Sequence, residues 1–347
     1  MLAFSSYADA HLHIACITEM SIDDSLHVLN GAPYCAVSCA HEKDEFIEQE
    51  RRVAKINNAM TDAADSALRV QHGETAHGAE NDAQLRAVVH DAENGTYDSR
   101  LKTGAQIFCA FGMHPQLPLV ENAGFMESLL KEKRIVAIGE AGFDLFKQYR
   151  DDIARQETAW RISCELAGAY SVPLIVHCRK ALDRMFADAK LLAHIPAVIF
   201  HSFTGSVQDA VSLLRHGVNA YFSFGNPLIF GDKSAISCVQ KLPIDRLLLE
   251  TDAPYQTVRG EDETKLSGIA RVYAVAFAIR CGNAATERVA VEALTGRLAE
   301  FDERAAATER IDAIEHMAAT ERVAAIERAT EFAEHIFANF KRAYTVP

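Results

Sequence analysis

The chain alternates short apolar runs with longer segments of helical periodicity, and eight of the apolar runs have the length of a β-strand. Most of these runs are continuously apolar, which is typical of parallel strands that are covered on both faces. Helical patterns lie between them, as in 206–217, where Ser206 and Asp209 have capping-box spacing and Gly217 gives a stop signal. The predicted strands are 7–14, 34–40, 107–115, 135–142, 173–179, 197–203, 219–225 and 246–254.

Eight strands that alternate with helices predict an α/β protein with a TIM (β/α)8 barrel. A barrel of this type takes about 250 residues. Part of the 347-residue chain is therefore surplus to it. We expect a single domain over 1–347, with an insertion at about 71–104 after the second strand and its helix. The other surplus is an extended C-terminal helical region at about 296–347.

The two surplus segments differ in composition. Residues 71–104 are polar, rich in turn-forming residues and longer than a strand-to-helix connection requires. The motif ATER starts at 285, 307 and 319, within an Ala-, Glu- and Arg-rich stretch that favours helix. The last two copies are 12 residues apart, which is not a whole number of helical turns, so the apolar positions of the repeat move around the helix axis. This drift favours a solvated helix or helical hairpin over a coiled coil. Residues 331–340 restore an apolar stripe, which we expect to pack on the barrel.

The composition is that of an ordinary globular protein, with 49% hydrophobic and 24% charged residues. No run approaches the length of about 20 apolar residues that spans a bilayer. The first ten residues also lack a signal-peptide pattern, so we expect a cytoplasmic protein with no membrane partner and favour a monomer. The eight cysteines lack the CxxC spacing of a zinc knuckle and are expected to be reduced, mostly buried thiols.

The net charge of −13 argues against a broad basic surface for nucleic acid. However, residues 42–105 and 296–347 together hold 23 acidic and 15 basic side chains, and therefore −8 of that charge. The remaining residues carry only −5. The charge balance therefore does not exclude a phosphate-bearing substrate at the barrel itself.

Polar side chains gather where the predicted strands end, which is where a barrel of this type carries its functional groups. A lone His-x-His pair in an apolar strand is more often a pair of core residues than a metal site. Here five strands each end in a residue type that binds metals, and imidazoles with carboxylates suit Zn, Mn, Ni, Fe or Mg. The two-residue period of a strand places His11 and His13 on one face, with Leu12 toward the helices. The expected metal ligands are His11, His13, Glu140, His177, His201 and Asp252.

Two of these residues are also candidates for catalysis. Glu140 ends an apolar strand, where an unpaired carboxylate is costly, and we expect it to bridge two metal ions. A helix cap or a salt bridge is the structural alternative for this residue. Glu250 and Asp252 share one face of the last strand, and Asp252, which is nearer the loop, is the expected ligand and proton acceptor.

A further group of residues is expected to hold a phosphate. Arg179 can clamp an anion with two hydrogen bonds, and an exposed salt bridge is the alternative. The turn Thr204, Gly205, Ser206 opens a helix whose free amides can bind an anion. The alternative is that Ser206 caps that helix, and the two roles are compatible. His114, at the end of the third strand, is expected to position the substrate.

The motifs DAHLHI, FGMHP, AIGEAGFD, PLIVHCRKA, FHSFTGS and LLLETDAPY occur in this order between residue 8 and about 260. Together they resemble the TatD family of metal-dependent hydrolases. The resemblance implies a TIM barrel, a mono- or dinuclear divalent metal site and magnesium-dependent deoxyribonuclease activity, often 3′–5′ exonucleolytic. By position, the six expected ligands match the metal ligands of the family. The chain departs from the family pattern at Gln116, where a second histidine is common, and after Arg259 and Gly260, where acidic EDETK replaces an Asn-rich turn.

We therefore hypothesise a divalent-metal-dependent hydrolase that cleaves phosphodiester bonds of DNA or a similar substrate, with two ions (Mg, Mn, Zn or similar) that activate water and polarise the phosphate. The first alternative is an amidohydrolase-type enzyme that cleaves C–N or ester bonds of a small molecule, because that group shares the His-x-His opening. A carbamylated lysine often ends the fourth strand in that group, whereas Glu140 stands here. The second alternative is a degenerate barrel without catalysis, whose acidic insertions bind a partner.

The His-x-His stretch provides a direct test. We expect His11→Ala and His13→Ala each to lose bound metal with little loss of stability, because these rings are expected to bind ions. Leu12→Ala should instead lower the free energy of unfolding by about 2–5 kcal/mol, as for other buried leucines. Elemental analysis measures the metal, and urea unfolding of the metal-free proteins measures stability. Metal retained at the wild-type level in both histidine variants would contradict the hypothesis.

Overall fold

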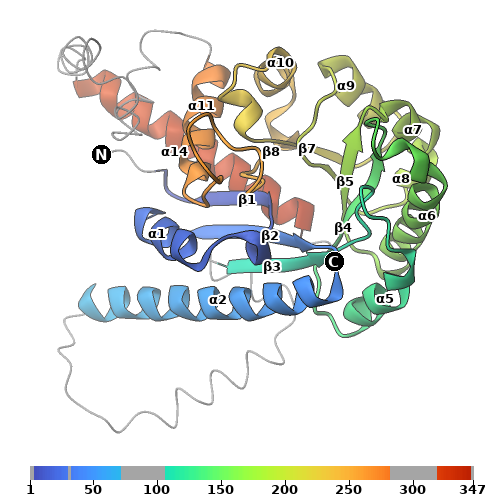
Figure 1. The fold of residues 1–347 in the computed structure, drawn as a ribbon. Helices are drawn as coiled ribbons and strands as arrows, with labels where there is room; N and C mark the ends of the chain where they lie inside the picture. The colour runs from blue at the N-terminus through green and yellow to red at the C-terminus, as the bar shows by residue number, and fades with distance from the viewer. Residues whose placement is uncertain (1–3, 30–32, 72–105, 282–318, 345–347) are drawn as a thin grey trace, which may run out of the picture.

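The computed structural model describes residues 4–29, 33–71, 106–281 and 319–344. Its strands form one eight-stranded parallel sheet, in chain order, that curves into a barrel (Figure 1). The predicted TIM-like barrel is therefore confirmed. The strands are β1 (Tyr7–Leu12), β2 (Tyr34–Ala40), β3 (Gln106–Phe111), β4 (Ala137–Asp144), β5 (Leu174–Arg179), β6 (Val198–Phe200), β7 (Ala220–Phe224) and β8 (Leu247–Leu249).

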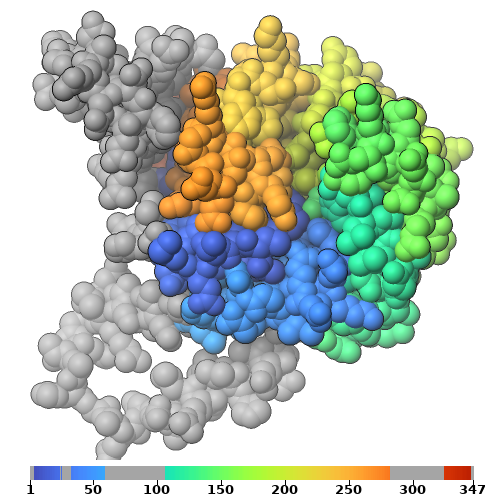
Figure 2. Space-filling model, viewed as in Figure 1, coloured from blue at the N-terminus to red at the C-terminus, as the bar shows by residue number. Residues whose placement is uncertain are grey.

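The first and last strands close the ring. Asp252, just after β8, donates its N–H to the carbonyl of His11 at 3.0 Å, and His13 donates to the carbonyl of Ala253 at 2.7 Å. The buried carboxylate of Asp9 strengthens this closure, because it accepts from the N–H and the hydroxyl of Thr251 at 2.9 and 2.7 Å. In the space-filling view, the blue surface from the start of the chain lies against the orange surface of the segment that follows β8 (Figure 2).

Helices cover the outside of the strands, and most of them follow a strand directly. The predicted capping box is present at the start of α9, where the N–H of Asp209 donates to the hydroxyl of Ser206 at 3.2 Å. The insertion expected at 71–104 starts at the last residue of α2, and the rest of it lies outside the described residues. The first two ATER motifs lie outside them as well. The described α-helices are α1 (Glu19–Leu29), α2 (Lys43–Gln71), α5 (Ala123–Lys131), α6 (Ile153–Tyr170), α7 (Leu182–Ala187), α8 (Ala189–Leu192), α9 (Val207–Arg215), α10 (Lys233–Lys241), α11 (Gly268–Cys281) and α14 (Ala319–Tyr344).

A β-bulge in β1 decides which side chains of this strand enter the barrel. Ala10 lies in the apolar cluster inside the barrel, whereas Leu12 lies in the outer layer between strands and helices. Regular alternation would put both residues on the same face. Between Asp9 and Leu12, however, β1 advances three residues while β2 advances two. Leu12 therefore faces the helices, as predicted, and the histidines on either side of it face the interior.

A second bulge has the same effect in β4. Ala137 lies inside the barrel, but Ala141, four residues later, lies in the outer layer. Between Ile138 and Ala141, β4 advances three residues while β5 advances two. Bulges of this kind redirect side chains next to functional sites. Here the bulge directs Glu140 into the barrel.

The last helix, α14, covers the amino-terminal end of the barrel. Phe340 is fully buried in the interior apolar cluster, which confirms that the stripe predicted at 331–340 packs on the barrel. Asn339 donates through Nδ2 to the carbonyls of Ile244 and Leu247, at 2.6 and 2.8 Å. Leu247 is the first residue of β8 and Ile244 lies just before this strand, so the helix is fixed to the sheet by hydrogen bonds as well as by apolar contacts.

Two expectations from composition can be compared with the structure. All eight cysteines are free thiols, as predicted, and most of them are buried. Among the described residues, no helix combines the length and the hydropathy needed to cross a membrane.

Because Asn339 attaches α14 to the sheet, we expect its substitution to lower the stability of the protein. We expect Asn339→Leu to lower the free energy of unfolding by about 2–4 kcal/mol, because one buried and one partly buried carbonyl lose their donor. Glu331→Gln, at an exposed position of the same helix, should change it by less than about 0.5 kcal/mol. Urea unfolding of both variants measures the difference. Equal stability of the two variants would show that the hydrogen bonds of Asn339 do not hold the helix.

Candidate metal centre

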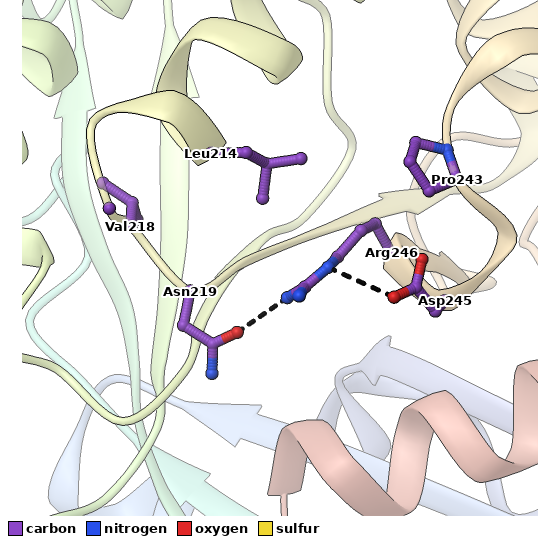
Figure 3. Close-up of a pocket in the computed structure, with 7 residues that line it drawn as sticks. Leu214, Val218, Asn219, Pro243, Asp245 and Arg246 are labelled. Carbon is purple, nitrogen blue, oxygen red and sulfur yellow. Dashed lines mark hydrogen bonds and ion pairs between the residues drawn. The ribbon is translucent and has the colours of Figure 1, made fainter.

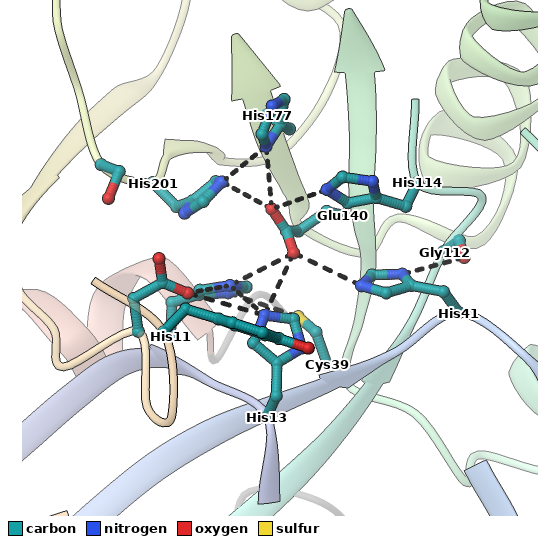
Figure 4. Close-up of polar contacts among 12 residues, drawn as sticks. His11, His13, Cys39, His41, Gly112, His114, Glu140, His177 and His201 are labelled. Atoms are coloured by element: carbon teal, nitrogen blue, oxygen red, sulfur yellow. Dashed lines mark hydrogen bonds and ion pairs between the residues drawn. The ribbon is translucent and has the colours of Figure 1, made fainter. Parts of the chain in front are cut away.

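The carboxyl ends of the strands bring one carboxylate and several imidazoles together inside the barrel (Figure 4). Glu140, from the bulge in β4, lies at the centre and is only 2% exposed. Its Oε1 atom faces three ring nitrogens. The Nε2 atoms of His11 and His13 both lie at 3.3 Å, and the Nε2 atom of His41 lies at 3.4 Å.

The other oxygen of Glu140 faces a second group of rings. Its Oε2 atom lies 2.5 Å from Nε2 of His201, 3.3 Å from Nδ1 of His177 and 3.6 Å from Nε2 of His114. The facing nitrogens of His177 and His201 are 3.2 Å apart. A carboxylate with imidazoles at both oxygens has the arrangement needed to bridge two cations.

Asp252 completes the group on the Oε1 side. Its Oδ1 atom lies 3.6 Å from the Nε2 atoms of both His11 and His13. Its Oδ2 atom accepts a hydrogen bond of 2.5 Å from the amide of Gln256. The backbone of Asp252 has a φ of 55°, a left-handed conformation that aspartate tolerates better than most residues. Gln256 therefore holds one carboxylate oxygen and leaves the other to face the two rings.

Further carboxylates lie behind the histidines on the Oε2 side. Nε2 of His177 is 3.4 Å from the fully buried Asp144, and Nδ1 of His201 is 4.0 Å from the fully buried Glu250. Metal-binding histidines usually direct their second nitrogen at such an acceptor, which fixes the orientation of the ring. Gln116 donates to the same Asp144 at 2.7 Å. The glutamine that departs from the family pattern thus supports the carboxylate behind His177.

Two glycines allow β4 to pack closely enough for this geometry. A Cβ atom at Gly142, which has a φ of 142°, would lie 2.1 Å from the carbonyl oxygen of His177. A Cβ atom at Gly112 would lie 2.5 Å from the carbonyl oxygen of Glu140. Both contacts are backbone contacts that cannot be relieved by a side-chain rotation. Glycine is therefore required at both positions.

The cluster keeps its carboxylates ionised. Burial acts to raise the pKa of Glu140, but the surrounding rings, above all His201 and His11, hold it well below its usual range. Burial also acts to raise the pKa of Asp252, but the hydrogen bond from His13 and the nearby rings lower it. Burial itself lowers the pKa of His11 to about 4, so this ring is neutral at neutral pH.

The donor set fits divalent metal ions. Ligand atoms that each lie about 2.0–2.2 Å from one ion lie about 3.0–3.6 Å from one another. The distances between ring nitrogens and carboxylate oxygens fall in this range, except for the shorter pair of His201 and Glu140. Nε2 of His41 is buried without a hydrogen-bond partner among the described residues, as expected of an atom that faces an ion. Imidazole with carboxylate is a ligand combination of zinc, manganese, nickel and iron sites.

The structure brings all six expected ligands together in this cluster. His114, which was expected to position the substrate, also lies within it. Arg179 lies further out, 48% exposed, with its guanidinium 3.8 Å from Asp144 and 4.2 Å from the ring centre of Phe146. Thr204 is exposed. The expected ligands are His11, His13, Glu140, His177, His201 and Asp252.

The turn before α9 is partly occupied by its own cap. The N–H and the hydroxyl of Ser206 both donate to the carboxylate of Asp209, at 2.8 and 2.7 Å. The carbonyl of Gly205 accepts from the hydroxyl of Ser234 at 2.7 Å. The helix cap thus uses the amide of Ser206. An anion at this turn would have to be bound by the other groups of the turn.

His41 was not among the residues expected from the sequence. It follows Ala40, the last residue of β2, and therefore obeys the same rule as the other ligands: a polar side chain directly after an apolar strand. The second predicted strand ended at residue 40, and the histidine after it was left out. Extending that rule by one residue would have found it.

A surface hollow elsewhere on the barrel is separate from this cluster (Figure 3). Asn219 and Arg246, which line it, directly precede β7 and β8 and are joined by a hydrogen bond of 2.7 Å. The hollow therefore lies at the amino ends of the strands. The cluster of His, Glu and Asp side chains lies at the carboxyl ends.

Metal-dependent hydrolases are one class of protein that combines a parallel eight-stranded barrel with a buried cluster of His, Glu and Asp at the carboxyl ends of its strands. The family profile described as "TatD related DNase" matches residues 8–345. The chain therefore belongs to the TatD family of metal-dependent hydrolases.

Curated relatives match parts of the chain. The 3′-5′ ssDNA/RNA exonuclease TatD of Cronobacter turicensis is 34% identical over 181 residues, which are 46% of this chain and 67% of that protein. The uncharacterized metal-dependent hydrolase YabD of Bacillus subtilis is 34% identical over 157 residues, which are 44% of this chain and 60% of that protein. The matches thus span about two thirds or less of the relatives' own length.

Solved structures share the fold over almost the full length. The crystal structure of YjjV, a TatD homologue from Escherichia coli, has a TM-score of 0.58 at 21% identity and covers 98% of each chain. A TatD-family hydrolase from Entamoeba histolytica has a TM-score of 0.57 at 15% identity and covers 99% of each chain. These similarities support the barrel fold.

The charges in the cluster predict that metal binding weakens as the pH falls. Burial acts to lower the pKa of His201, but the carboxylate of Glu140 outweighs it and raises the pKa to about 9. Below that pH a metal ion must displace a proton from His201, whereas above it the ring is already neutral. We expect zinc affinity to rise from about pH 6 to about pH 9, with release of about one proton or more near pH 7. Calorimetric titration of the metal-free protein in buffers of different ionisation enthalpy measures this release, and binding without it would contradict the assignment.

Proposed function

We propose that this TatD-family hydrolase cleaves phosphodiester bonds of single-stranded nucleic acid, with DNA as the first substrate to test, as a 3′–5′ exonuclease with two divalent ions. The observation that carries the proposal is the position of Glu140, whose two oxygens face separate groups of imidazoles. A relative that is 34% identical is named a 3′-5′ ssDNA/RNA exonuclease, which favours this class of substrate.

Two sets of ligands share the central carboxylate. Bound divalent ions would lower the pKa of water and offset the negative charge that develops on a phosphate during hydrolysis. The proposed ligands are His11, His13, Asp252 and Oε1 of Glu140 for one ion, and His177, His201 and Oε2 of Glu140 for the other.

Asp252 is the proposed proton acceptor. Its pKa is held low in spite of burial, so the carboxylate is ionised at neutral pH and can take up a proton during turnover. Gln256 holds Oδ2 of this carboxylate and also donates to the hydroxyl of Ser202. The side chain is thereby fixed beside the histidines of β1.

The proposed substrate contacts surround the cluster. The N–H of Gln116 donates to Nδ1 of His114 at 3.1 Å, so the neutral ring carries its proton on Nε2 and can donate to a phosphate oxygen. Arg179 is positively charged and 48% exposed, and it can bind a phosphate with two hydrogen bonds. Thr204 and Gly205 are proposed to face the nucleic acid at the start of α9.

The activity is tested on protein that has been chelated and then reloaded with Mg, Mn, Zn or Co. With single-stranded DNA labelled at the 5′ end, we expect a ladder of shortening labelled fragments, and a 3′-terminal phosphorothioate should block it. Asp252→Asn should lower kcat by about 100-fold or more, because it removes a proton acceptor. His216→Ala, at an exposed position at the end of α9, serves as the control and should retain activity.

Two results would overturn the proposal. The first is the absence of cleavage of DNA, RNA and a model phosphodiester with every metal. The second is unchanged cleavage in a His201→Ala variant. Cyclic amides and lactones are tested in parallel, because such a barrel also supports hydrolysis of C–N and ester bonds. Turnover of these compounds alone would assign a C–N or ester hydrolase instead.

A further inference from the structure

His41 places an additional ring nitrogen in the metal cluster. The residue directly follows β2, and its side chain is 15% exposed. Its Nε2 atom is buried, has no hydrogen-bond partner among the described residues and lies 3.4 Å from Oε1 of Glu140. The ring lies between two other imidazoles of the cluster, with ring centres 5.5 Å from His13 and 4.9 Å from His114.

The hydrogen bond on the other side of the ring fixes the role of Nε2. Nδ1 of His41 lies 3.3 Å from the carbonyl oxygen of Gly112. A carbonyl oxygen can only accept, so the neutral ring must carry its proton on Nδ1. Nε2 is then an unprotonated nitrogen whose lone pair faces the carboxylate of Glu140. Two acceptors that face each other in a buried site are stabilised by a cation between them.

His114 shows the opposite arrangement in the same cluster. Its Nδ1 atom accepts from the backbone N–H of Gln116 at 3.1 Å, so its neutral ring carries the proton on Nε2. Nε2 of His114, 3.6 Å from Oε2 of Glu140, therefore carries a hydrogen and has no free lone pair for a metal. The two neighbouring rings are thus set by backbone groups for different tasks: ligation for His41 and hydrogen-bond donation for His114.

The spacing on the Oε1 side supports ligation by His41. Nε2 of His41 and Nε2 of His13 lie 3.4 and 3.3 Å from the same carboxylate oxygen of Glu140. Atoms that share one ion at about 2.0–2.2 Å are about 3.0–3.6 Å apart. One atom from each of these three residues can therefore approach a common cation, and the three atoms all lie within 4.8 Å of one another.

We propose that His41 is a metal ligand that shares a divalent ion with His13 and Glu140. This assignment adds a nitrogen donor to the six ligands expected from the sequence. It does not depend on the phosphodiester activity proposed above. Zinc, cobalt and nickel bind imidazole well, whereas magnesium prefers oxygen ligands. The added nitrogen therefore makes this position selective for a late transition metal over magnesium.

The test uses the full-length protein after chelation, with zinc and magnesium as separate probes. Competition with a chromophoric chelator gives the zinc dissociation constant, and calorimetry gives that of magnesium. We expect His41→Ala to weaken zinc binding by about tenfold or more and magnesium binding much less. His216→Ala removes an exposed histidine outside the cluster and is the control, in which zinc affinity should be unchanged.

A spectroscopic measurement separates ligation from a structural role. The visible absorption of the cobalt-loaded protein should change in His41→Ala, and added imidazole should restore it by filling the space that the ring leaves. His41→Gln can retain the hydrogen bond to Gly112 and should show the same loss of zinc affinity. This second variant provides the test if the alanine variant does not fold. Wild-type zinc affinity in either variant, or an equal loss in His216→Ala, would overturn the proposal.

Discussion

The negative charge of a carboxylate buried inside the barrel must be balanced by nearby groups. The arrangement of residues at the carboxyl ends of the strands depends on this requirement. An ionised carboxylate removed from water costs several kcal/mol unless it is paired and hydrogen-bonded. Glu140 is almost fully buried, and the rings around it keep it ionised. Two further buried carboxylates, Asp144 and Glu250, lie behind His177 and His201. The polar network replaces an apolar core at this end of the barrel and creates a place for cations.

Backbone irregularities make this network possible. Regular strands would keep the side-chain pattern of the inner apolar layer up to the end of the barrel and direct Glu140 outward. The bulges in β1 and β4 reverse that pattern just before the ligands. Glycines at positions 112 and 142 then let β4 approach its neighbours without a clash. These two bulges and two glycines therefore position the side chains of the cluster.

The two ends of the barrel differ in role: the amino end stabilises the fold, and the carboxyl end carries the polar cluster. At the amino end, α14 contributes Phe340 to the inner apolar cluster and Asn339 to the carbonyls before and within β8. At the carboxyl end, charged and polar groups face one another at hydrogen-bonding distance. This division is common to barrels of this type, because the loops after the strands can vary while the opposite end holds the ring together. The cluster of His, Glu and Asp side chains is thus separate from the packing that stabilises the fold.

The sequence by itself determined the eight strands, the barrel and six residues of the cluster, because apolar runs of strand length are local patterns and the ends of parallel strands meet at one edge. It did not determine which face of β4 carries Glu140, since a bulge depends on the pairing with β5. It also did not determine the proposed role of His41, which rests on a hydrogen bond to Gly112, 71 residues away. Likewise, the amide of Ser206 is used by its helix cap and is not free for an anion. Register and hydrogen-bond direction arise between segments that are distant in the chain, so only the tertiary structure decided them.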